Sequence, residues 1–444
     1  MVTWDAKKEK TFLPWISAQK DRYIVVVGVQ DVLEHPQIYS IQHHPVEFYR
    51  VAKELIYLPF VYEDPHHLAL VELKQIQEEV NAQASDFIDQ GLKLLHNHQA
   101  NLLQPFSKAE DLYGKFTQTK AIVCGAGPSL DALIPFLKKA KDTFLIIGCG
   151  SGVKALLASG ITPHLAVHVD MEPSHTFKEF AFPLFFQLRT DPKILALAQG
   201  KKFIMGSASS FPLTKWLEDE LDIASSEEGG WTSTTRGATL AYELGCKEIY
   251  FAGMDFAYGA SHYAKGVKAS LDSFIEILLQ NGKKLKTKPD WVLAAKWLDR
   301  YVIEHPDREW GVLSHDQLLM PHVKRVDIEH LILEPQENLN FLEICATASE
   351  EEGRRVHALF KAQKEEVQLL LQAILARFQE LFPEMPGEDA LFQELIKKLE
   401  EKALTERMLV PIWEIWEPVF KRMEGAHPDH LLLHQTLFFQ TVVE

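Results

Sequence analysis

The strongest constraint on the fold is the short apolar run 121–124, which is followed directly by the turn Gly125-Ala126-Gly127-Pro128-Ser129. Apolar residues then recur at helical spacing, at Leu130, Leu133, Ile134 and Leu137. This order predicts a buried strand, a tight turn and the N-terminus of a helix. Glycines let the backbone approach a ligand closely, and helix N-termini favour anions. We therefore expect Gly125, Gly127, Pro128 and Ser129 to bind a phosphate, although a purely structural turn is the alternative.

Four more apolar runs follow in the middle of the chain and alternate with helical patterns. They cover residues 143–147, 164–169, 202–205 and 248–252. Strands that are apolar on both faces and separated by helices predict a doubly wound, mostly parallel, Rossmann-like sheet. The chain is long enough for several domains. We expect a small N-terminal α/β domain with a long helix at 1–112, the Rossmann-like domain at 113–325 and a helical domain at 326–444.

Composition narrows the class of protein. Hydrophobic residues make up 46% and charged residues 24% of the chain, as in ordinary globular proteins. The net charge of −16 argues against a nucleic-acid partner, because phosphate backbones require a basic face. The polar N-terminus lacks the apolar core of a signal peptide, and no run is long enough to cross a bilayer. We expect a cytoplasmic protein without a transmembrane segment, and its oligomeric state is left open.

Cysteines and histidines give little sign of a metal or disulfide site. The four cysteines are too scattered for either, and we expect them to be small buried side chains in a reducing compartment; they are Cys124, Cys149, Cys246 and Cys345. Paired histidines in the first segment, among them His96 and His98, suggest a metal at first sight. Their side chains would point in different directions, so we favour a solvated surface.

Polar residues gather where the predicted strands end. Gly148 and Ser151 follow the second strand, Asp170 the third and Asp255 the fifth. In doubly wound sheets ligands bind beyond the carboxyl ends of the strands. Asp170 is suited to accept hydrogen bonds from a ribose or to bind Mg²⁺ that bridges phosphates. Capping of the next turn is the alternative, but we favour a ligand role because the other strand ends meet at the same edge.

Two further stretches are suited to a ligand. Hydroxyl residues 232–235, with Thr234 among them, precede a helix predicted at 238–244, and Arg236 follows them. Such a run binds a phosphate or a carboxylate, or simply caps the helix, and we leave both uses open. His262 lies in the aromatic loop after Asp255 and is suited to acid/base chemistry, with a surface position as the alternative.

The first turn argues against two common nucleotide folds. It lacks the Lys-Ser/Thr of a P-loop, and Leu130 stands where the dinucleotide fingerprint has its third glycine. We therefore do not expect a P-loop ATPase or a dehydrogenase.

The middle third resembles the MptE-like domain shared by the motility-associated factor (Maf) glycosyltransferases and the archaeal 6-hydroxymethylpterin diphosphokinases. The matching stretches are 123–130, 158–163 leading to Asp170, and 244–258 with Ser261 and His262. The same stretches are similar to bacterial sialyltransferases that use CMP-sialic acid. Two departures stand out. Ala126 replaces an asparagine of their first turn, and Leu285-Lys286-Thr287 stands before Asp290 where they have a histidine base.

This resemblance implies a Maf-type glycosyltransferase that moves a nonulosonic, sialic-acid-like sugar from a CMP donor to a serine or threonine of a protein, without a cofactor. The first turn would lie against the CMP phosphate and ribose, and Asp170 or Asp255 would orient the ribose or the sugar. His262 would accept the proton of the attacking hydroxyl, and Arg236 would stabilise the leaving phosphate.

Two alternatives come from the same resemblance. One is a 6-hydroxymethylpterin diphosphokinase-like pyrophosphoryl transferase that uses ATP, with Mg²⁺ bound by Asp170 and Asp255. The other is a non-catalytic binding protein with a nucleotide-sugar fold, which Ala126 and the missing histidine would suit. The long flanking domains favour the glycosyltransferase, because a small pterin needs no extra docking surface.

Overall fold

The computed structural model describes residues 2–3, 24–27, 38–39, 93–171, 178–207, 212–224, 232–258, 263–267, 274–278, 284–313, 320–331, 341–349, 351–381, 389–413, 417 and 428–444. The chain divides into two compact units, one of residues 1–91 and 410–438 and the other of residues 92–409 and 439–444. The larger unit contains the sheet and the pocket described below. The predicted boundaries of three domains stay a prediction.

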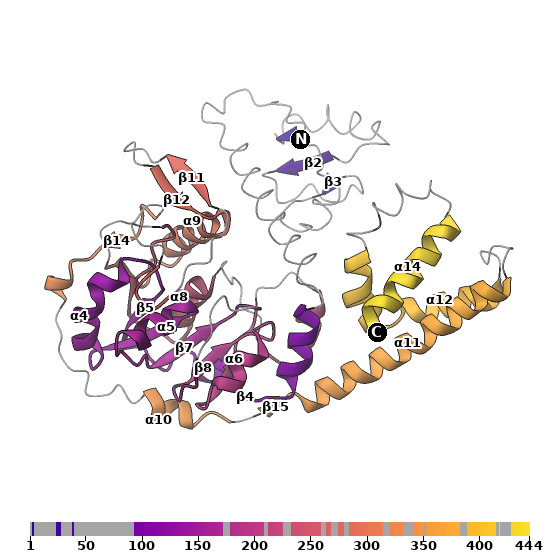
Figure 1. Ribbon diagram of the computed structural model, residues 1–444, viewed down its shortest axis with the longest axis horizontal. Helices are drawn as coiled ribbons and strands as arrows, with labels where there is room; N and C mark the ends of the chain where they lie inside the picture. The colour runs from indigo at the N-terminus through magenta and orange to yellow at the C-terminus, as the bar shows by residue number, and fades with distance from the viewer. Residues whose placement is uncertain are drawn as a thin grey trace. The chain divides into compact units, whose positions relative to one another are not determined.

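A ten-stranded sheet forms the centre of the larger unit, in the order β14-β13-β10-β5-β6-β7-β8-β9-β4-β15 (Figure 1). Neighbouring strands are parallel, except that β15 pairs with β4 in the antiparallel sense. The predicted mostly parallel sheet is therefore confirmed. The strands are β4 (Pro105–Lys108), β5 (Lys120–Cys124), β6 (Phe144–Cys149), β7 (Leu165–His168), β8 (Leu184–Phe186), β9 (Lys202–Ile204), β10 (Glu248–Ala252), β13 (Glu309–Val312), β14 (Lys324–Arg325) and β15 (Glu351–Glu352).

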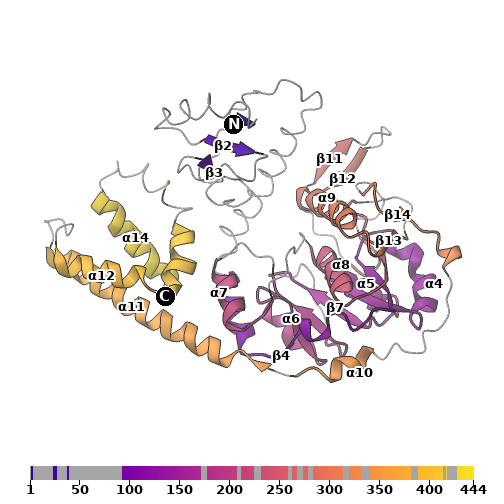
Figure 2. The same cartoon turned by 180° about the vertical axis from the view of Figure 1, so that it is seen from behind.

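Helices cover both faces of this sheet (Figures 1 and 2). Alternate residues of a strand point to opposite faces, so Val123 of β5 joins one apolar cluster and Ile122 joins another. The first cluster includes apolar residues of α8, α9 and α10, and the second includes those of α4 and α5. The helices are α4 (Leu130–Ala140), α5 (Ser151–Ala158), α6 (Pro192–Leu197), α7 (Pro212–Glu220), α8 (Ser233–Glu243), α9 (Pro289–Glu304) and α10 (Phe341–Ala346).

The sheet changes its direction of growth at β5. Strands β6 to β9 follow one another on one side of β5, whereas β10, β13 and β14 extend the sheet on the other side. In open α/β sheets a ligand crevice forms at such a switch point, beyond the carboxyl ends of the strands. The fold therefore directs attention to the residues that follow β5 and β10.

A small antiparallel hairpin lies between β10 and α9 in the chain. It consists of β11 (Ile275–Leu278) and β12 (Lys284–Thr287). The backbone N–H of Tyr258 donates to the carbonyl oxygen of Lys286 at 2.8 Å, which ties β12 to the loop after β10. The hairpin projects from the sheet in Figure 1.

The segments before and after the sheet are simpler. In the smaller unit, β1 (Val2–Thr3), β2 (Ile24–Val27) and β3 (Ile38–Tyr39) form a parallel three-stranded sheet. Of the long helix predicted from about His67 to Leu103, residues 93–102 are helical, Leu103 lies in a turn, and residues 67–92 lie outside the described residues. The C-terminal region is helical as predicted, with α11 (Arg354–Leu381), α12 (Ala390–Glu400), a π-helix (Thr405–Leu409) and α14 (Pro428–Val443).

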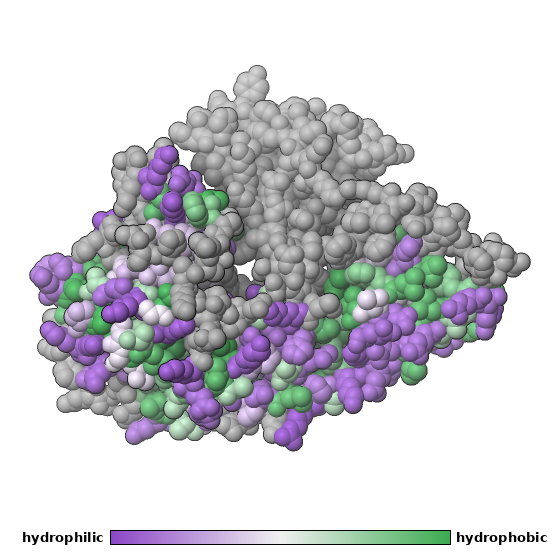
Figure 3. Space-filling model, in the orientation of Figure 1, coloured by the Kyte–Doolittle hydropathy of each residue, from purple (hydrophilic) through white to green (hydrophobic). Residues whose placement is uncertain are grey.

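Helix α11 is amphipathic. Its buried residues, among them Phe360 and Leu371, recur at helical spacing, and hydrophilic residues line its outer side in Figure 3. Among the described helices, none combines the length and the apolar character that crossing a membrane requires.

Candidate functional site

A pocket with a volume of about 300 Å³ lies at the carboxyl ends of β5, β6, β7 and β10. Five segments meet there: residues 125–127 after β5, 149–151 at the start of α5, Asp170 after β7, 232–234 at the start of α8, and 253–257 after β10. Tyr263 and three residues at the start of α9, Lys288, Asp290 and Trp291, complete the lining. The predicted strand ends therefore do converge on one site.

Gly125 and Gly127, which follow β5, are required because the turn after β10 packs closely against them. The N–H of Gly125 donates to Ala252 O at 2.9 Å, and the N–H of Gly127 donates to Gly253 O at 2.8 Å. A Cβ atom on Gly125 would lie 2.5 Å from Gly253 O. A Cβ atom on Gly127 would lie 2.7 Å from the same oxygen and closer still to Asp255 Oδ2. Two backbone turns thus pack together more closely than any side chain allows.

Asp255 occupies the position where we expected a ligand anion. Its Oδ2 accepts a hydrogen bond from the backbone N–H of Ser129 at 2.9 Å, at the N-terminus of α4. Pro128 and Ser129 themselves are not among the residues that line the pocket. The prediction that this helix start binds a phosphate directly needs correction, because a carboxylate of the protein already satisfies one of its N–H groups.

Asp170 lies between the starts of two helices. Ser233 Oγ, in the first turn of α8, donates to Asp170 Oδ2 at 3.1 Å, and Gly150, just before α5, lines the pocket beside it. The Asp170 side chain is exposed to the pocket but deeply surrounded by protein. The resulting loss of hydration raises the pKa of this carboxyl, while the hydrogen bond from Ser233 and the charge of Arg189 oppose the increase. Such a carboxyl is suited to hydrogen bonding with ligand hydroxyl groups.

The backbone around Asp170 is held by the loop that follows β8. The N–H of Asp191 donates to Asp170 O at 3.0 Å, and Thr190 Oγ1 donates to His168 O at 2.9 Å. This loop is in turn fixed by buried amides on the helical stretch 93–102. Asn97 Nδ2 donates to Met171 O at 3.1 Å and to Arg189 O at 2.9 Å. A buried polar layer therefore positions the acidic residue of the pocket.

The same helical stretch corrects one expectation. His98 is fully buried and not solvated as predicted, because its ring lies within hydrogen-bond distance of Leu94 O and of Thr214 Oγ1 (3.0 Å). Burial lowers the pKa of His98 to about 4, so the ring is neutral.

The hydroxyl run at the start of α8 both caps the helix and faces the pocket. Thr232 is the N-cap residue and forms a capping box with Thr235, so these two hydroxyls bond to backbone N–H groups of the helix. Ser233 and Thr234 line the pocket together with Thr232. Because Thr232 is the N-cap residue, the helix begins at Ser233, five residues before the predicted start at Ala238.

Arg236 does not reach the pocket, contrary to prediction. Its guanidinium is completely buried and donates to Glu243 Oε2 at 2.8 Å, to the hydroxyl of Thr239 and to that of Tyr113 at 3.5 Å. Glu243 lies seven residues further along α8 and therefore on the same face of the helix. The side chain is held by structural partners and is not available to a ligand phosphate.

The three remaining predicted residues, Ser151, Gly148 and His262, have different outcomes. Ser151 lines the pocket as expected. Gly148 lies within β6 and is covered by Val153 and Pro163, so it does not line the pocket. His262 lies outside the described residues.

The cysteines are all buried and free, as predicted. Cys149 contributes to the pocket lining, and burial raises the pKa of its thiol well above the usual range. It therefore stays a neutral thiol and is not suited to act as a nucleophile.

Tyr263, Lys288 and Trp291 line the pocket although the sequence did not predict them, and Asp290 was named only for the residues that precede it. The available signal was Pro289, a residue typical of the first helical turn. The start of a helix at this proline would have marked residues 288–291 as one more candidate ligand-facing segment.

Fold and pocket together define a Rossmann-like α/β domain with a polar pocket at its topological switch point. Residues 92–261 match the family model described as 6-hydroxymethylpterin diphosphokinase MptE-like, and this part of the chain is an MptE-like domain. The assignment made from the sequence is therefore confirmed.

Among solved structures, the chain is similar to the MAf glycosyltransferase from Magnetospirillum magneticum AMB-1. The TM-score is 0.54 at 15% sequence identity, and the likeness covers 82% of this chain and 62% of that one. The chain thus spans less than two thirds of that protein, and the likeness concerns the fold. No curated protein matches the sequence.

Proposed function

We propose that this protein is a Maf-type glycosyltransferase, which moves a nonulosonic, sialic-acid-like sugar from a CMP donor to a serine or threonine of a protein. The observation that carries the proposal is the pocket at the switch point, where Asp170, Ser233 and Asp255 meet. The MptE-like domain and the fold shared with a MAf glycosyltransferase support a transferase of this type.

Binding of the donor would use the polar lining of the pocket. Asp170 accepts hydrogen bonds from hydroxyl groups of the ribose or the sugar, and Ser233 and Thr234 add hydroxyl contacts. Gly150 has no side chain, so a ligand can approach the first amides of α5 and the hydroxyl of Ser151. The backbone of Gly125 and Gly127 lines the pocket beside Asp255.

Transfer requires the acceptor hydroxyl oxygen to form a bond with the anomeric carbon while the bond from that carbon to the phosphate oxygen breaks. CMP leaves with the bonding electrons, and a base takes the hydroxyl proton. His262 is the base that the sequence suggests, and Asp290 is a second candidate because it lines the pocket. No cofactor is needed for this reaction.

Calorimetry with CMP, ATP and GTP is the direct test. The proposal expects CMP to bind, and Asp170→Asn and Ser233→Ala to weaken that binding without lowering the free energy of unfolding. Asp219→Asn, at an exposed position on α7, is the control. The proposal also expects His262→Ala to reduce turnover more than binding. Tight binding of ATP without binding of CMP would overturn it.

Pyrophosphoryl transfer from ATP to a pterin alcohol is a second candidate, because the matching family model carries that description. Asp170 and Asp255 would then hold Mg²⁺, which would neutralise charge on the phosphates. Among the described residues no group of three or more potential metal ligands gathers at one place. The two carboxylates nevertheless fit Mg²⁺, since this ion is often bound by one or two carboxylates together with substrate phosphates. Activity that requires ATP and is lost with EDTA would favour this reaction.

A non-catalytic binding protein is the third candidate. Ala126 stands in place of an asparagine, and no histidine precedes Asp290 where the sialyltransferases have one. Nucleotide-sugar binding without turnover, with every tested acceptor, would favour it.

A further inference from the structure

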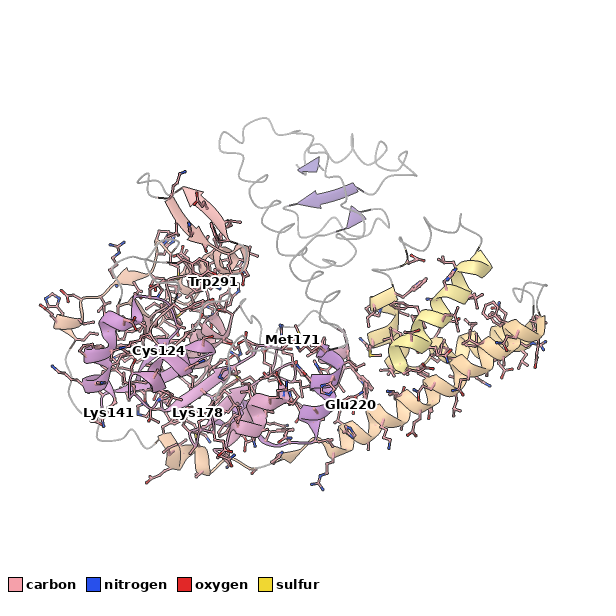
Figure 4. The ribbon with its side chains drawn as sticks, viewed as in Figure 1. Cys124, Lys141, Met171, Lys178, Glu220 and Trp291 are labelled. Atoms are coloured by element: carbon pink, nitrogen blue, oxygen red, sulfur yellow. The ribbon has the colours of Figure 1, made fainter. Side chains whose placement is uncertain are left out.

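One wall of the pocket is built by the start of α9, which follows directly on strand β12 of the hairpin. Burial along β12 alternates, so that Lys284 and Lys286 face outward while Leu285 and Thr287 are buried. Lys288 follows at the same spacing of two residues, at the point where the chain leaves the strand, and it lines the pocket. Trp291, labelled in Figure 4, lies one turn further along, in α9.

Three aromatic rings, those of Tyr258, Tyr263 and Trp291, contact one another beside Lys288. The ring of Trp291 lies 4.8 Å from that of Tyr258 and 6.0 Å from that of Tyr263, measured between centroids. The ammonium group of Lys288 lies 5.3 Å from the centre of the Trp291 ring. Tyr258 is buried and tied to β12 through its backbone N–H, so the cluster has a fixed base. Trp291 and Tyr263 line the pocket and are only partly buried.

The charges of the pocket are distributed unevenly. Asp170, Asp255 and Asp290 are acidic, and Lys288 is the cation among the described residues of the lining. On the inner side, Asp255 already accepts from the N–H of Ser129, and Asp170 accepts from Ser233. Carboxylates at this position repel an anion but accept hydrogen bonds from hydroxyl groups. Asp290 lies two residues from Lys288, in the first turn of α9. Lys288 is therefore the described lining residue whose charge attracts an anionic group of a ligand.

We propose that Lys288, Trp291 and Tyr263 form a subsite for an oxyanion attached to a ring, with the hydroxyl-rich part of the ligand directed towards Asp170. The ammonium of Lys288 donates to the oxyanion, and the aromatic rings pack against the flat or apolar face of the ligand. The subsite rests on the proposed function and makes it more specific, because it names the residues that hold an acidic group of the donor. The oxyanion is either the phosphate of the nucleotide or the carboxylate of an acidic sugar.

The experiment compares dissociation constants of wild type, Lys288→Gln and Lys284→Gln by calorimetry. The ligands are cytidine, CMP and a CMP-linked nonulosonic acid, with adenosine and ATP as a second pair. Lys284 is the matched control, since it lies on the same face of the hairpin, is 75% exposed and pairs with Glu276 at 4.0 Å. Loss of a charge-assisted hydrogen bond weakens binding by about tenfold or more.

For Lys288→Gln we expect the preference for charged over uncharged ligands to fall about tenfold, with cytidine affinity and the free energy of unfolding unchanged. If Lys288 binds the phosphate, CMP and the CMP-linked sugar weaken together; if it binds the sugar carboxylate, only the latter weakens. Lys284→Gln should behave as wild type. Trp291→Ala should weaken charged and uncharged ligands equally, as loss of ring contacts requires.

The outcomes separate this subsite from the proposed function. A wild type that binds ATP but not CMP, together with a lower preference for ATP over adenosine in Lys288→Gln, would contradict the proposed function alone. Binding of CMP, with the affinities of both CMP and the CMP-linked sugar relative to cytidine the same in Lys288→Gln as in wild type, would overturn the subsite alone. A wild type that binds none of the five ligands would overturn both.

Discussion

The carboxylate of Asp255 accepts a hydrogen bond from the backbone N–H of Ser129 at 2.9 Å, and this bond joins the carboxyl ends of β5 and β10. The N–H of Gly127 donates to Gly253 O beside it at 2.8 Å. At the start of the helix that follows β5, the backbone N–H of Ser129 therefore already has an anionic acceptor within the protein. The first turn and the β10 turn form one rigid wall of the pocket, and ligand anions must find their partners elsewhere.

Asp255→Ala should lower the free energy of unfolding by about 1–3 kcal/mol, because the N–H of Ser129 would lose its acceptor. Asp255→Asn keeps a carbonyl oxygen at the same place and should cost clearly less. Urea denaturation of both variants measures the difference. Equal stability of the alanine variant and wild type would show that the bond does not hold the two turns together.

Gly127→Ala should be more damaging than its size suggests. The added Cβ would lie 2.7 Å from Gly253 O and would overlap Asp255 Oδ2, and both neighbours belong to a packed turn. We expect a loss of about 1–3 kcal/mol in the free energy of unfolding, the usual cost of overpacking. Nucleotide affinity should fall as well, because the wall of the pocket must shift.

The control for Gly127→Ala is Ala126→Gly, which changes a methyl group in the same turn without adding a contact. It should cost no more than a few tenths to about 1 kcal/mol, through backbone entropy. Thermal denaturation and calorimetry with CMP can be run on both variants. If Gly127→Ala were as stable as wild type and bound CMP normally, the close packing of the two turns would be refuted.

The sheet was predictable because its central strands are covered on both faces. Such strands read as continuous apolar runs, and 248–252 matches β10 residue for residue. By contrast, β8 has only three residues, Leu184–Phe186, within a longer apolar stretch and carries no signal of its own. Strands β4 and β15 were missed because their pairing joins Phe106 to Glu351, across a sequence distance that local patterns do not reveal.

The pocket was predictable as far as it consists of strand ends. Asp170, Ser151 and Thr234 follow from the rule that ligands bind at the carboxyl edge of a parallel sheet. The prediction that Arg236 contacts a ligand phosphate was wrong, because the helix starts earlier than predicted and the Arg236 side chain is directed towards Glu243. Lys288 and Trp291 reach the pocket only because β12 folds back against Tyr258, a contact that depends on tertiary structure.

Arg236 should matter for stability and not for the ligand. Arg236→Met removes the partner of Glu243 inside the protein, which typically costs about 3–5 kcal/mol. The double variant Arg236→Met/Glu243→Met removes both charges and should recover much of that loss. Urea denaturation measures the stabilities, and CMP affinity of the folded double variant should equal that of wild type. Loss of CMP binding in the stable double variant would instead support the phosphate contact that the sequence suggested.

Glu218 should make stability depend on pH. Its side chain is 3% exposed, and burial raises its pKa from 4.5 to about 7, although the N–H of Ser207 donates to it at 3.0 Å. The folded protein therefore binds more protons than the unfolded chain between about pH 4.5 and 7.

The contribution of Glu218 to stability is consequently greatest below pH 4.5 and is lost as the pH rises through 7. Glu218→Gln keeps an acceptor for Ser207 but cannot ionise, so the variant should gain up to about 3 kcal/mol relative to wild type between pH 4.5 and 8. Free energies of unfolding in urea at pH 5, 6, 7 and 8 provide the measurement, with Glu365→Gln at an exposed position on α11 as the control. A difference between Glu218→Gln and wild type that stays constant over this range would mean that the carboxyl ionises normally inside the fold.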